Sequence, residues 1–326
     1  MNNLDYLHIF TPYFSTSYSQ KFLLNLYNKQ SLSDSDTHSY NNCYSFISFI
    51  ESGIQYFKQL QFTPIQIKPL LLYYGTLHLI KACILIVDPL YPESTAVLAH
   101  GVSARKKKKQ NYEFLTDEIK IQRYGLFTHM AERMFHMKHL EGNKFSMVSL
   151  LEEIPELKSL FYTMKKKNTF MDMIVNSQAA TANIPISILD YYHMTAERFQ
   201  QYIMDKGKFP LKKVEQNGTE LQLHFDTPYH FTRSTCLPFR YNFLSNNYSI
   251  TLNRNGHTQT LPDLMILYLL LYNLSMISRY ETEWWSDLFK SMPHYDLPFI
   301  ESLLQIAENK IPMIIFDWLA TFQDSL

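Results

Sequence analysis

The sequence predicts a mainly α protein, a helical bundle that carries a small antiparallel β insert. The first observation behind this prediction is that apolar residues recur at helical spacing through 1–204 and again through 259–326. The second is a change to alternating apolar and polar residues between 205 and 258. We therefore expect a helical domain over 1–204, a β insert over 205–258, and C-terminal helices over 259–326 that pack on the helical domain.

Each expected helix is an apolar-periodic segment bounded by Pro, Gly or a polar cluster. These helices are expected at 19–28, 37–62, 68–87, 126–140, 149–164, 186–204, 263–278, 281–290, 298–309 and 312–322. Pro64 and Pro69 leave a short connection between the second and third helices, so we expect these two to form an antiparallel pair. One short strand is expected at 118–122, where polar and apolar residues alternate.

The β insert is predicted by its turns. Two alternating runs, 211–216 and 219–225, are joined by Asn217 and Gly218. Asn-Gly is typical of a two-residue hairpin turn, because both central positions need positive φ. A further strand is expected at 248–252, shortly before a second Asn-Gly pair.

The apolar segment 70–87, bounded by Pro69 and Asp88, has about 18 residues, which is the minimum length of a membrane-spanning helix. It contains His78 and Lys81, so we expect a buried helix of a soluble core instead. The N-terminus lacks a basic stretch followed by an apolar one, which argues against a secretory signal. Three cysteines far apart in the sequence fit a reducing compartment, and we expect the protein to be cytoplasmic.

The composition excludes several common enzyme classes. Only 8 glycines occur, and neither GxGxxG nor GxxxxGK[ST] can be found, which argues against Gly-rich phosphate loops. There is no GxSxG motif and no cysteine with a histidine close by in the sequence. The residues therefore favour a protein without catalytic activity, although they leave the question open.

A run of five consecutive cations, Arg105–Lys109, stands out because the formal net charge of the chain is 0. His100, Gly101 and Ser103 precede it, and phosphates bind such mixtures of fixed charges and neutral donors. The alternative is a solvated loop whose charges only maintain solubility. In this basic loop, 100–110, the candidate ligand-binding residues are His100, Ser103, Arg105, Lys106, Lys107, Lys108 and Lys109.

A second candidate surface lies near the C-terminus. Arg279 and Tyr280 end an apolar helix, and Trp284 and Trp285 open the next one. Trp, Tyr and Arg dominate binding hot spots, so Arg279, Tyr280 and Trp284 are candidate partner-binding residues. The alternative is packing, since two adjacent tryptophans on a helix point in different directions and one of them is expected in the core.

Histidines on the expected helix 126–140 allow two further interpretations. His129, Glu132, His136 and His139 would share one helix face, as metal ligands in bundles do, but the spacing is not HExxH and we assign no metal or cofactor. Arg123 with His129, and Arg133 with His139, fit the Arg-to-His spacing of HEPN-type ribonucleases. In such enzymes His would act as general acid or base and Arg would hold the phosphate.

Five stretches of the chain resemble the bacterial YaaC-like family. They are 68–75 (KPLLLYYG), 97–103 (VLAHGVS), 131–136 (AERMFH), 274–276 (LSM) and 278–280 (SRY). The resemblance covers nearly the whole chain, and its first stretch is also similar to the HEPN helical core. Genes of this family commonly stand beside the gene for IMP dehydrogenase, so the resemblance implies a role in purine nucleotide metabolism.

The leading hypothesis is therefore a non-catalytic cytoplasmic regulatory protein of purine nucleotide metabolism. It would bind a guanine polyphosphate, such as the alarmone (p)ppGpp, through the basic loop and act on IMP dehydrogenase. The alternative is a HEPN-like, metal-independent ribonuclease that uses Arg123, His129, Arg133 and His139. The residues leave the identity of the ligand and the oligomeric state open.

Overall fold

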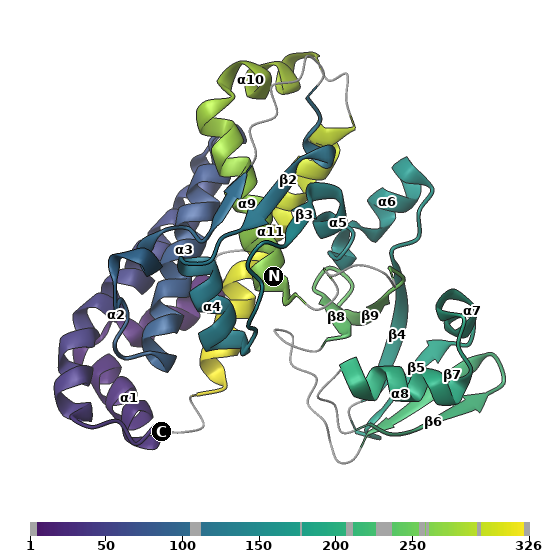
Figure 1. Cartoon of the computed structure of the whole chain (residues 1–326), viewed down its shortest axis with the longest axis horizontal. Helices are drawn as coiled ribbons and strands as arrows, with labels where there is room; N and C mark the ends of the chain where they lie inside the picture. The colour runs from purple at the N-terminus through teal and green to yellow at the C-terminus, as the bar shows by residue number, and fades with distance from the viewer. Residues whose placement is uncertain are drawn as a thin grey trace. The chain divides into compact units, whose positions relative to one another are not determined.

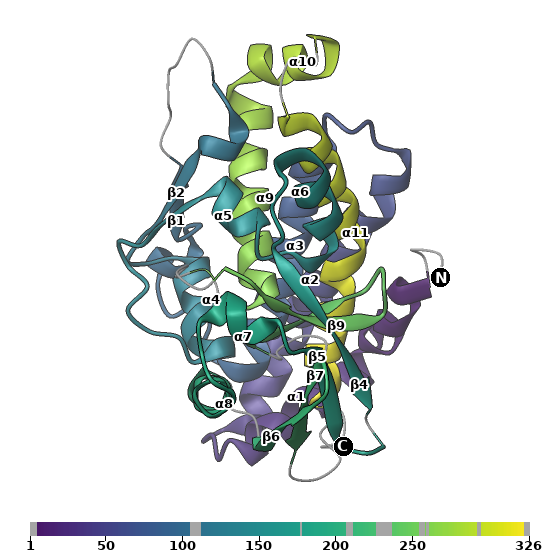
Figure 2. The ribbon, with the colours of Figure 1, turned by 90° about the vertical axis from the view of Figure 1, so that its right-hand side faces the viewer.

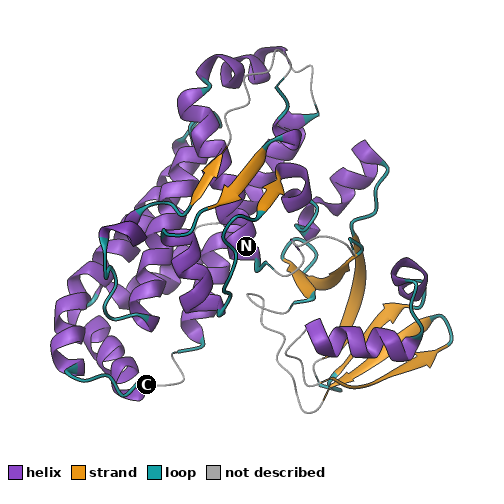
Figure 3. Ribbon diagram, in the orientation of Figure 1, coloured by secondary structure: helices purple, strands orange, loops and turns teal. Residues whose placement is uncertain are grey.

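The computed structural model describes residues 5–104, 112–176, 178–206, 211–225, 237–253, 258, 261–291 and 295–322. Within them the chain is mainly α, as predicted, and also contains two antiparallel sheets (Figures 1 and 3). The chain forms two compact units. The helical unit comprises Met1–Met147 and Leu267–Leu326, and the sheet unit comprises Val148–Ile266.

The longest helices belong to the helical unit. Its helices are η1 (Asp5–Phe14), α1 (Thr16–Lys29), α2 (Ser35–Gln59), η2 (Leu60–Phe62), α3 (Lys68–Val87), η3 (Thr95–Leu98), η4 (Phe114–Thr116), α4 (Leu126–Phe135), α9 (Asp263–Tyr280, which begins in the sheet unit), α10 (Thr282–Ser291) and α11 (Asp296–Ala320). Both α2 and α11 pack beside α3, and Figure 2 shows these helices from a second direction.

Helix α3 forms the centre of this unit. It pairs closely with α2: a Cβ at Gly53 would lie 2.7 Å from the Leu79 side chain, and one at Gly75 would lie 3.0 Å from Tyr56 Cβ. By length and composition α3 is the one described helix that qualifies as a membrane span, yet 67% of its most apolar window is buried in the protein. Core helices of soluble proteins have the same composition, so α3 alone is weak evidence for a membrane.

Several predicted helix boundaries were wrong, and the helices predicted at 149–164 and 186–204 are each divided into shorter ones. The segment 126–140 is helical only to Phe135, because His136 adopts a left-handed conformation with φ 55° and ends α4. In contrast, the predicted helices 298–309 and 312–322 are one helix, α11, with Pro312 inside. Proline removes one helical hydrogen bond, but apolar residues before and after it, such as Leu304 and Ile315, are buried and favour continuation.

A three-stranded sheet in the helical unit has the order β1-β2-β3. Its strands are β1 (Val102–Ala104), β2 (Glu118–Ile121) and β3 (Lys144–Ser146). The strand predicted at 118–122 is thus confirmed as β2. The antiparallel register of β1 and β2 places Val102 opposite Ile121 and Ala104 opposite Ile119.

The sheet unit contains a six-stranded antiparallel sheet of order β6-β7-β5-β4-β9-β8. Its strands are β4 (Phe170–Asn176), β5 (Thr181–Pro185), β6 (Leu211–Asn217), β7 (Glu220–Phe225), β8 (Phe239–Asn242) and β9 (Asn247–Thr251). The predicted hairpin is confirmed as β6 and β7, with Gly218 at φ 60° in the turn, and the strand predicted at 248–252 is confirmed as β9.

The prediction of a small insert was wrong. It missed β4 and β5, which lie within the stretch predicted as helical, and β4 pairs with β9 far along the chain. Short helices precede this sheet, namely α5 (Met147–Leu151), η5 (Pro155–Leu157) and α6 (Lys158–Lys165), and two others, α7 (Ile188–Tyr192) and α8 (Ala196–Lys206), pack on it. Tyr192 and Phe199 from these helices are buried with Leu221 and Leu223 of β7.

Candidate functional site

The segment before β1 is held by a close contact between two glycines. A Cβ at Gly125 would lie 2.2 Å from the backbone nitrogen of Gly101, and Gly125 has φ 136°, so a side chain is excluded there. The N–H of Leu126 donates to the carbonyl of Ala99 at 2.7 Å, and the N–H of Phe127 donates to the carbonyl of His100 at 3.2 Å. The start of α4 thereby fixes the backbone of His100.

Two buried tyrosines hold the rest of His100. Its Nδ1 lies 2.7 Å from the hydroxyl of Tyr73 on α3. That hydroxyl donates to the hydroxyl of Tyr268 on α9 at 3.0 Å, and Tyr268 donates to the carbonyl oxygen of His100 at 2.8 Å. Burial raises the pKa of both tyrosines far above the ordinary value, so both hydroxyls keep their protons. The imidazole is therefore fixed in position and orientation.

Two cations, Lys81 on α3 and Arg279 on α9, are close enough to this imidazole for their charges to lower its pKa. The Lys81 ammonium is 5.6 Å from the ring centre of Phe49. The Arg279 guanidinium donates to the hydroxyl of Tyr74 at 3.2 Å and to the carbonyl of Ser275 at 3.0 Å. Among the described residues, neither cation has an acidic partner.

The pKa values in this region are lowered by burial and, at the two histidines, also by nearby positive charge. Burial lowers the pKa of His100, and the charges of Arg279 and Lys81 lower it further. Burial, followed by the charge of Lys81, also lowers the pKa of His78. Burial lowers the pKa of Lys81 itself. We call this set of residues the His100 cluster: His100, Tyr73, Tyr268, Lys81 and Arg279. It includes His100, which is predicted to bind a ligand, and Arg279, which is predicted to bind a partner.

The basic run follows directly. Ser103, in β1, accepts a hydrogen bond from the Gln122 amide at 2.6 Å, and β1 ends at Ala104. Arg105, Lys106, Lys107, Lys108 and Lys109 lie outside the described residues. After them, the hydroxyl of Tyr112 donates to Asp117 at 2.6 Å, and Asp117 is buried. Described residues on both sides of the run are thus anchored.

The other predicted partner-binding residues have different environments. Trp284 donates its indole N–H to the carbonyl of Tyr112 at 3.1 Å, so it supports the residue that follows the basic run. Trp285 is the buried member of the pair and donates to the carbonyl of Gln66 at 2.9 Å. Tyr280 is 62% exposed, with its ring centre 5.2 Å from the Arg279 guanidinium. Tyr280 is therefore the residue of this group that is free to meet a partner surface.

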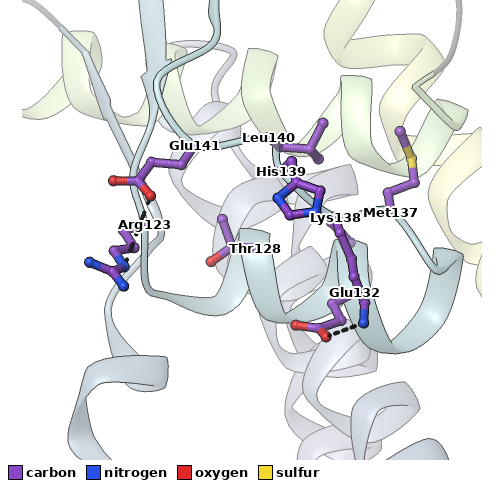
Figure 4. A pocket seen from close by; sticks show the side chains of 9 residues that line it. Arg123, Thr128, Glu132, Met137, Lys138, His139, Leu140 and Glu141 are labelled. Atoms are coloured by element: carbon purple, nitrogen blue, oxygen red, sulfur yellow. Dashed lines mark ion pairs between the residues drawn. The ribbon is translucent and has the colours of Figure 1, made fainter.

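The two Arg–His pairs are arranged differently from the predicted pairing. His129 and Arg133 both contact the carboxylate of Asp88, at 2.8 Å and 3.3 Å. Arg123 and His139 line one hollow of about 350 Å³, which Figure 4 shows from close by. The structure thus brings Arg123 together with His139, and Arg133 together with His129.

The charges in this hollow are paired with each other. Arg123 faces Glu141 at 4.0 Å, and Lys138 faces Glu132 at 3.5 Å (Figure 4). The stripe considered for a metal, His129, Glu132, His136 and His139, is interrupted because α4 ends at Phe135. No group of three or more His, Cys, Asp or Glu side chains that could hold a metal occurs in the described part of the chain.

Comparison with known proteins gives one match. A family model described as YaaC-like Protein matches residues 11–319. The chain belongs to the YaaC-like family. No curated protein and no solved structure matches it.

Three of the stretches that resemble this YaaC-like family meet in the His100 cluster. The stretch 68–75 contributes Tyr73, 97–103 contributes His100, and 278–280 contributes Arg279. Sequence reasoning missed the remaining members. A lysine inside an otherwise apolar helix was the available signal for Lys81, whereas nothing in the sequence singles out Tyr268 from the other tyrosines of α9.

Proposed function

We propose that this protein is a non-catalytic cytoplasmic regulatory protein of purine nucleotide metabolism. It binds a guanine polyphosphate such as (p)ppGpp at the His100 cluster and the adjoining basic run, and it acts on IMP dehydrogenase. The observation that carries the proposal is that Lys81 and Arg279, whose charges both lower the pKa of His100, have no acidic partner among the described residues.

Buried charges are costly unless they are paired, and proteins usually pair them. Lys81 shows that cost, because burial lowers its pKa. An anion at the cluster would neutralise Lys81 and Arg279 together and would regain the lost Coulomb energy. A phosphate group has the charge and the acceptor oxygens for both, and the guanidinium of Arg279 suits it through its planar set of donors.

The basic run supports a ligand with several phosphates. It begins two residues after Ser103 and supplies five more cations in the sequence. A single phosphate uses two or three cations, so the number of charges here favours a polyphosphate over an inorganic phosphate. The ring of Tyr74, which is partly exposed and lies on the same helix as Lys81, is a suitable surface for a purine base.

The proposed partner comes from the family context, and Tyr280 offers a contact point for it. Tyr280 is exposed and adjacent to Arg279, so a ligand that binds Arg279 would also change the surface around Tyr280. Nucleotide binding and partner binding would then be thermodynamically coupled.

The experiment measures nucleotide binding by isothermal titration calorimetry with (p)ppGpp, GDP and pyrophosphate. Lys81→Met and Arg279→Met should each weaken (p)ppGpp binding by about 10- to 100-fold, as expected for loss of a charged hydrogen bond of about 1.5–3 kcal/mol. Lys21→Met, which changes an exposed cation on α1, is the matched control and should have no effect. A pull-down with IMP dehydrogenase, with and without nucleotide, then tests the partner. Unchanged binding in both cluster variants would refute the proposed site.

The second candidate is the HEPN-like ribonuclease. One observation favours it, namely that Arg123 and His139 line the same hollow. If the pure protein cleaves single-stranded RNA and His139→Ala abolishes cleavage while His8→Ala does not, this alternative replaces the regulatory proposal. Absence of cleavage in the wild-type protein would exclude it under those conditions.

A further inference from the structure

A cavity of about 440 Å³ lies where three helices of the helical unit end. It is lined by Val87, the last residue of α3, by Met134 in the last turn of α4, and by Trp318 and Phe322 at the end of α11. Figure 1 shows α4 beside this end of α11, which is drawn in yellow. The rings of Trp318 and Phe322 touch, with centres 4.8 Å apart and planes inclined at 58°. The cavity therefore has an apolar corner, and none of its lining residues belongs to the His100 cluster.

Trp318 brings a hydrogen-bond donor to this corner. The chain has three tryptophans, and the other two donate their indole N–H groups to backbone carbonyls, Trp284 at 3.1 Å and Trp285 at 2.9 Å. The N–H of Trp318 has no acceptor among the described residues, although Trp318 is only 8% exposed. A tryptophan N–H usually finds a partner when it is buried. A molecule in the cavity that carries an acceptor atom would supply this partner.

The charged side chains around the corner are paired within the protein. Arg133 contacts Asp88 at 3.3 Å and Glu93 at 3.5 Å. Lys138 contacts Glu132 at 3.5 Å. The C-terminal ends of three helices add partial negative charge, which disfavours an anion, and the two cations disfavour a positively charged ligand. The cavity is therefore suited to a neutral molecule.

We infer that this cavity binds the base of a neutral nucleoside. A nucleobase is planar, so its face packs against the rings of Phe322 and Trp318, and its edge carries acceptor atoms for the Trp318 N–H. The volume lies at the lower end of the range of about 300–1,000 Å³ for small-molecule pockets, which fits a nucleoside better than a larger ligand. The inference goes beyond the proposed function and does not depend on it, because that function rests on phosphate contacts at other residues.

The indole N–H signals of the three tryptophans locate the ligand. They are measured by ¹H–¹⁵N correlation on the full chain, and Trp318→Phe identifies the signal of Trp318. Adenosine, guanosine and uridine are added in turn. We expect at least one of them to shift the Trp318 signal and to leave those of Trp284 and Trp285 in place. A shift of the Trp284 signal alone would place the nucleoside beside Tyr112, after the basic run, and would overturn the inference, as would the absence of any shift.

Benzimidazole and indole test the role of the N–H. They have the same ring shape, but only benzimidazole has an unprotonated ring nitrogen that accepts a hydrogen bond. In slightly alkaline buffer, in which both are neutral, the wild-type protein should bind benzimidazole about tenfold more tightly, because indole would cover the Trp318 N–H without satisfying it. Trp318→Phe keeps a ring but has no N–H, so this preference should disappear. Equal affinities in the wild-type protein, or an unchanged preference in Trp318→Phe, would contradict the assigned contact.

Phe322→Leu tests the packing of the base. It removes the ring but leaves an apolar side chain, and it should weaken nucleoside binding by about tenfold, as expected for the loss of one stacking contact. Phe62→Leu is the matched control, because Phe62 is 77% exposed and does not line the cavity. Near-ultraviolet circular dichroism checks that each variant remains folded. Equal binding in the Phe322 and Phe62 variants would refute the inference.

The charge argument and the independence from the proposed function are tested with the same signal. AMP should shift the Trp318 signal at concentrations no lower than adenosine, because the cavity offers no unpaired cation to its phosphate among the described residues. Tighter binding of AMP would contradict a site for neutral ligands. Lys81→Met and Arg279→Met should leave nucleoside binding unchanged. Loss of nucleoside binding in these two variants would move the ligand to the His100 cluster and overturn the inference.

Discussion

Arg240, in β8 of the sheet unit, is the largest fully buried side chain among those described, and its removal should be strongly destabilising. Its guanidinium binds the carboxylates of Glu153, at 3.2 Å, and Asp263, and it donates to the carbonyl of Leu261 at 3.1 Å. The side chain of Glu153 is 0% exposed, so its charge has little access to water. Breaking a buried ion pair by removing one partner costs about 3–5 kcal/mol, because the other charge remains buried and unpaired.

Arg240→Met should therefore lower the unfolding free energy by about 3–5 kcal/mol, which corresponds to a fall in Tm of about 10 °C. Urea unfolding followed by circular dichroism measures the loss, and hydrogen exchange should locate it in the sheet unit. The control is Lys158→Met. Lys158 pairs with Asp172, but the two side chains are 28% and 48% exposed, so this pair should contribute less than about 1 kcal/mol.

The charge argument also predicts a pH dependence. Burial raises the pKa of Glu153, while Arg240 opposes that rise. Without Arg240 the pKa of Glu153 should rise further. The loss of unfolding free energy caused by its buried charge is then present above that raised pKa and is relieved as the pH falls below it. Arg240→Met combined with Glu153→Gln should recover part of the loss for the same reason. A loss in Arg240→Met no larger than that in Lys158→Met, independent of pH, would refute the reasoning.

Two further predictions concern the helical unit. Asp296 accepts hydrogen bonds from the N–H groups of 114 and 115, at 2.7 Å and 3.2 Å, so Asp296→Asn should cost about 2 kcal/mol in urea unfolding and should weaken (p)ppGpp binding. An unchanged unfolding midpoint would contradict this. Burial tends to raise the pKa of Asp88, but His129 and Arg133 lower it overall. Stability from Asp88 is thus present above about pH 3.9 and is lost as the pH falls through the lower native pKa, so Asp88→Asn should flatten that part of the acid-unfolding curve.

Local signals in the sequence predicted much of the fold. The apolar run of α3, the alternation at β2 and the Asn217-Gly218 turn each specify structure through residues close in the chain. Strand β4 lacks such a signal, since its apolar residues fit a helix or a strand and its partner β9 lies much later in the chain. At Pro312 a local signal is misleading, because the burial of apolar residues before and after it in α11 outweighs the preference of proline to end a helix.

The candidate site could be predicted only in pieces. The sequence singles out His100 and Arg279 as members of different surfaces, because nothing in it reveals that the charge of Arg279 acts on His100. In the sequence, Lys81 argues only against a membrane span. Its significance depends on the absence of an acidic neighbour among the described residues, which is a property of the fold and cannot be derived from the order of residues along the chain.

Lys68 and Lys81 on the same helix show why an unpaired cation points to function. Lys68 is paired with Glu308 at 2.9 Å, as expected for a lysine whose role is structural. Lys81 is desolvated enough to lower its pKa, yet no carboxylate among the described residues offsets that cost. A residue that lowers stability in the free protein is retained most readily where it contributes to a bound state. Lys81→Met should accordingly leave the ligand-free protein as stable as wild type or more stable, while Lys68→Met should destabilise it. Destabilisation of the ligand-free protein by Lys81→Met, to the same extent as by Lys68→Met, would instead make Lys81 a structural residue and remove the main support for an anion site.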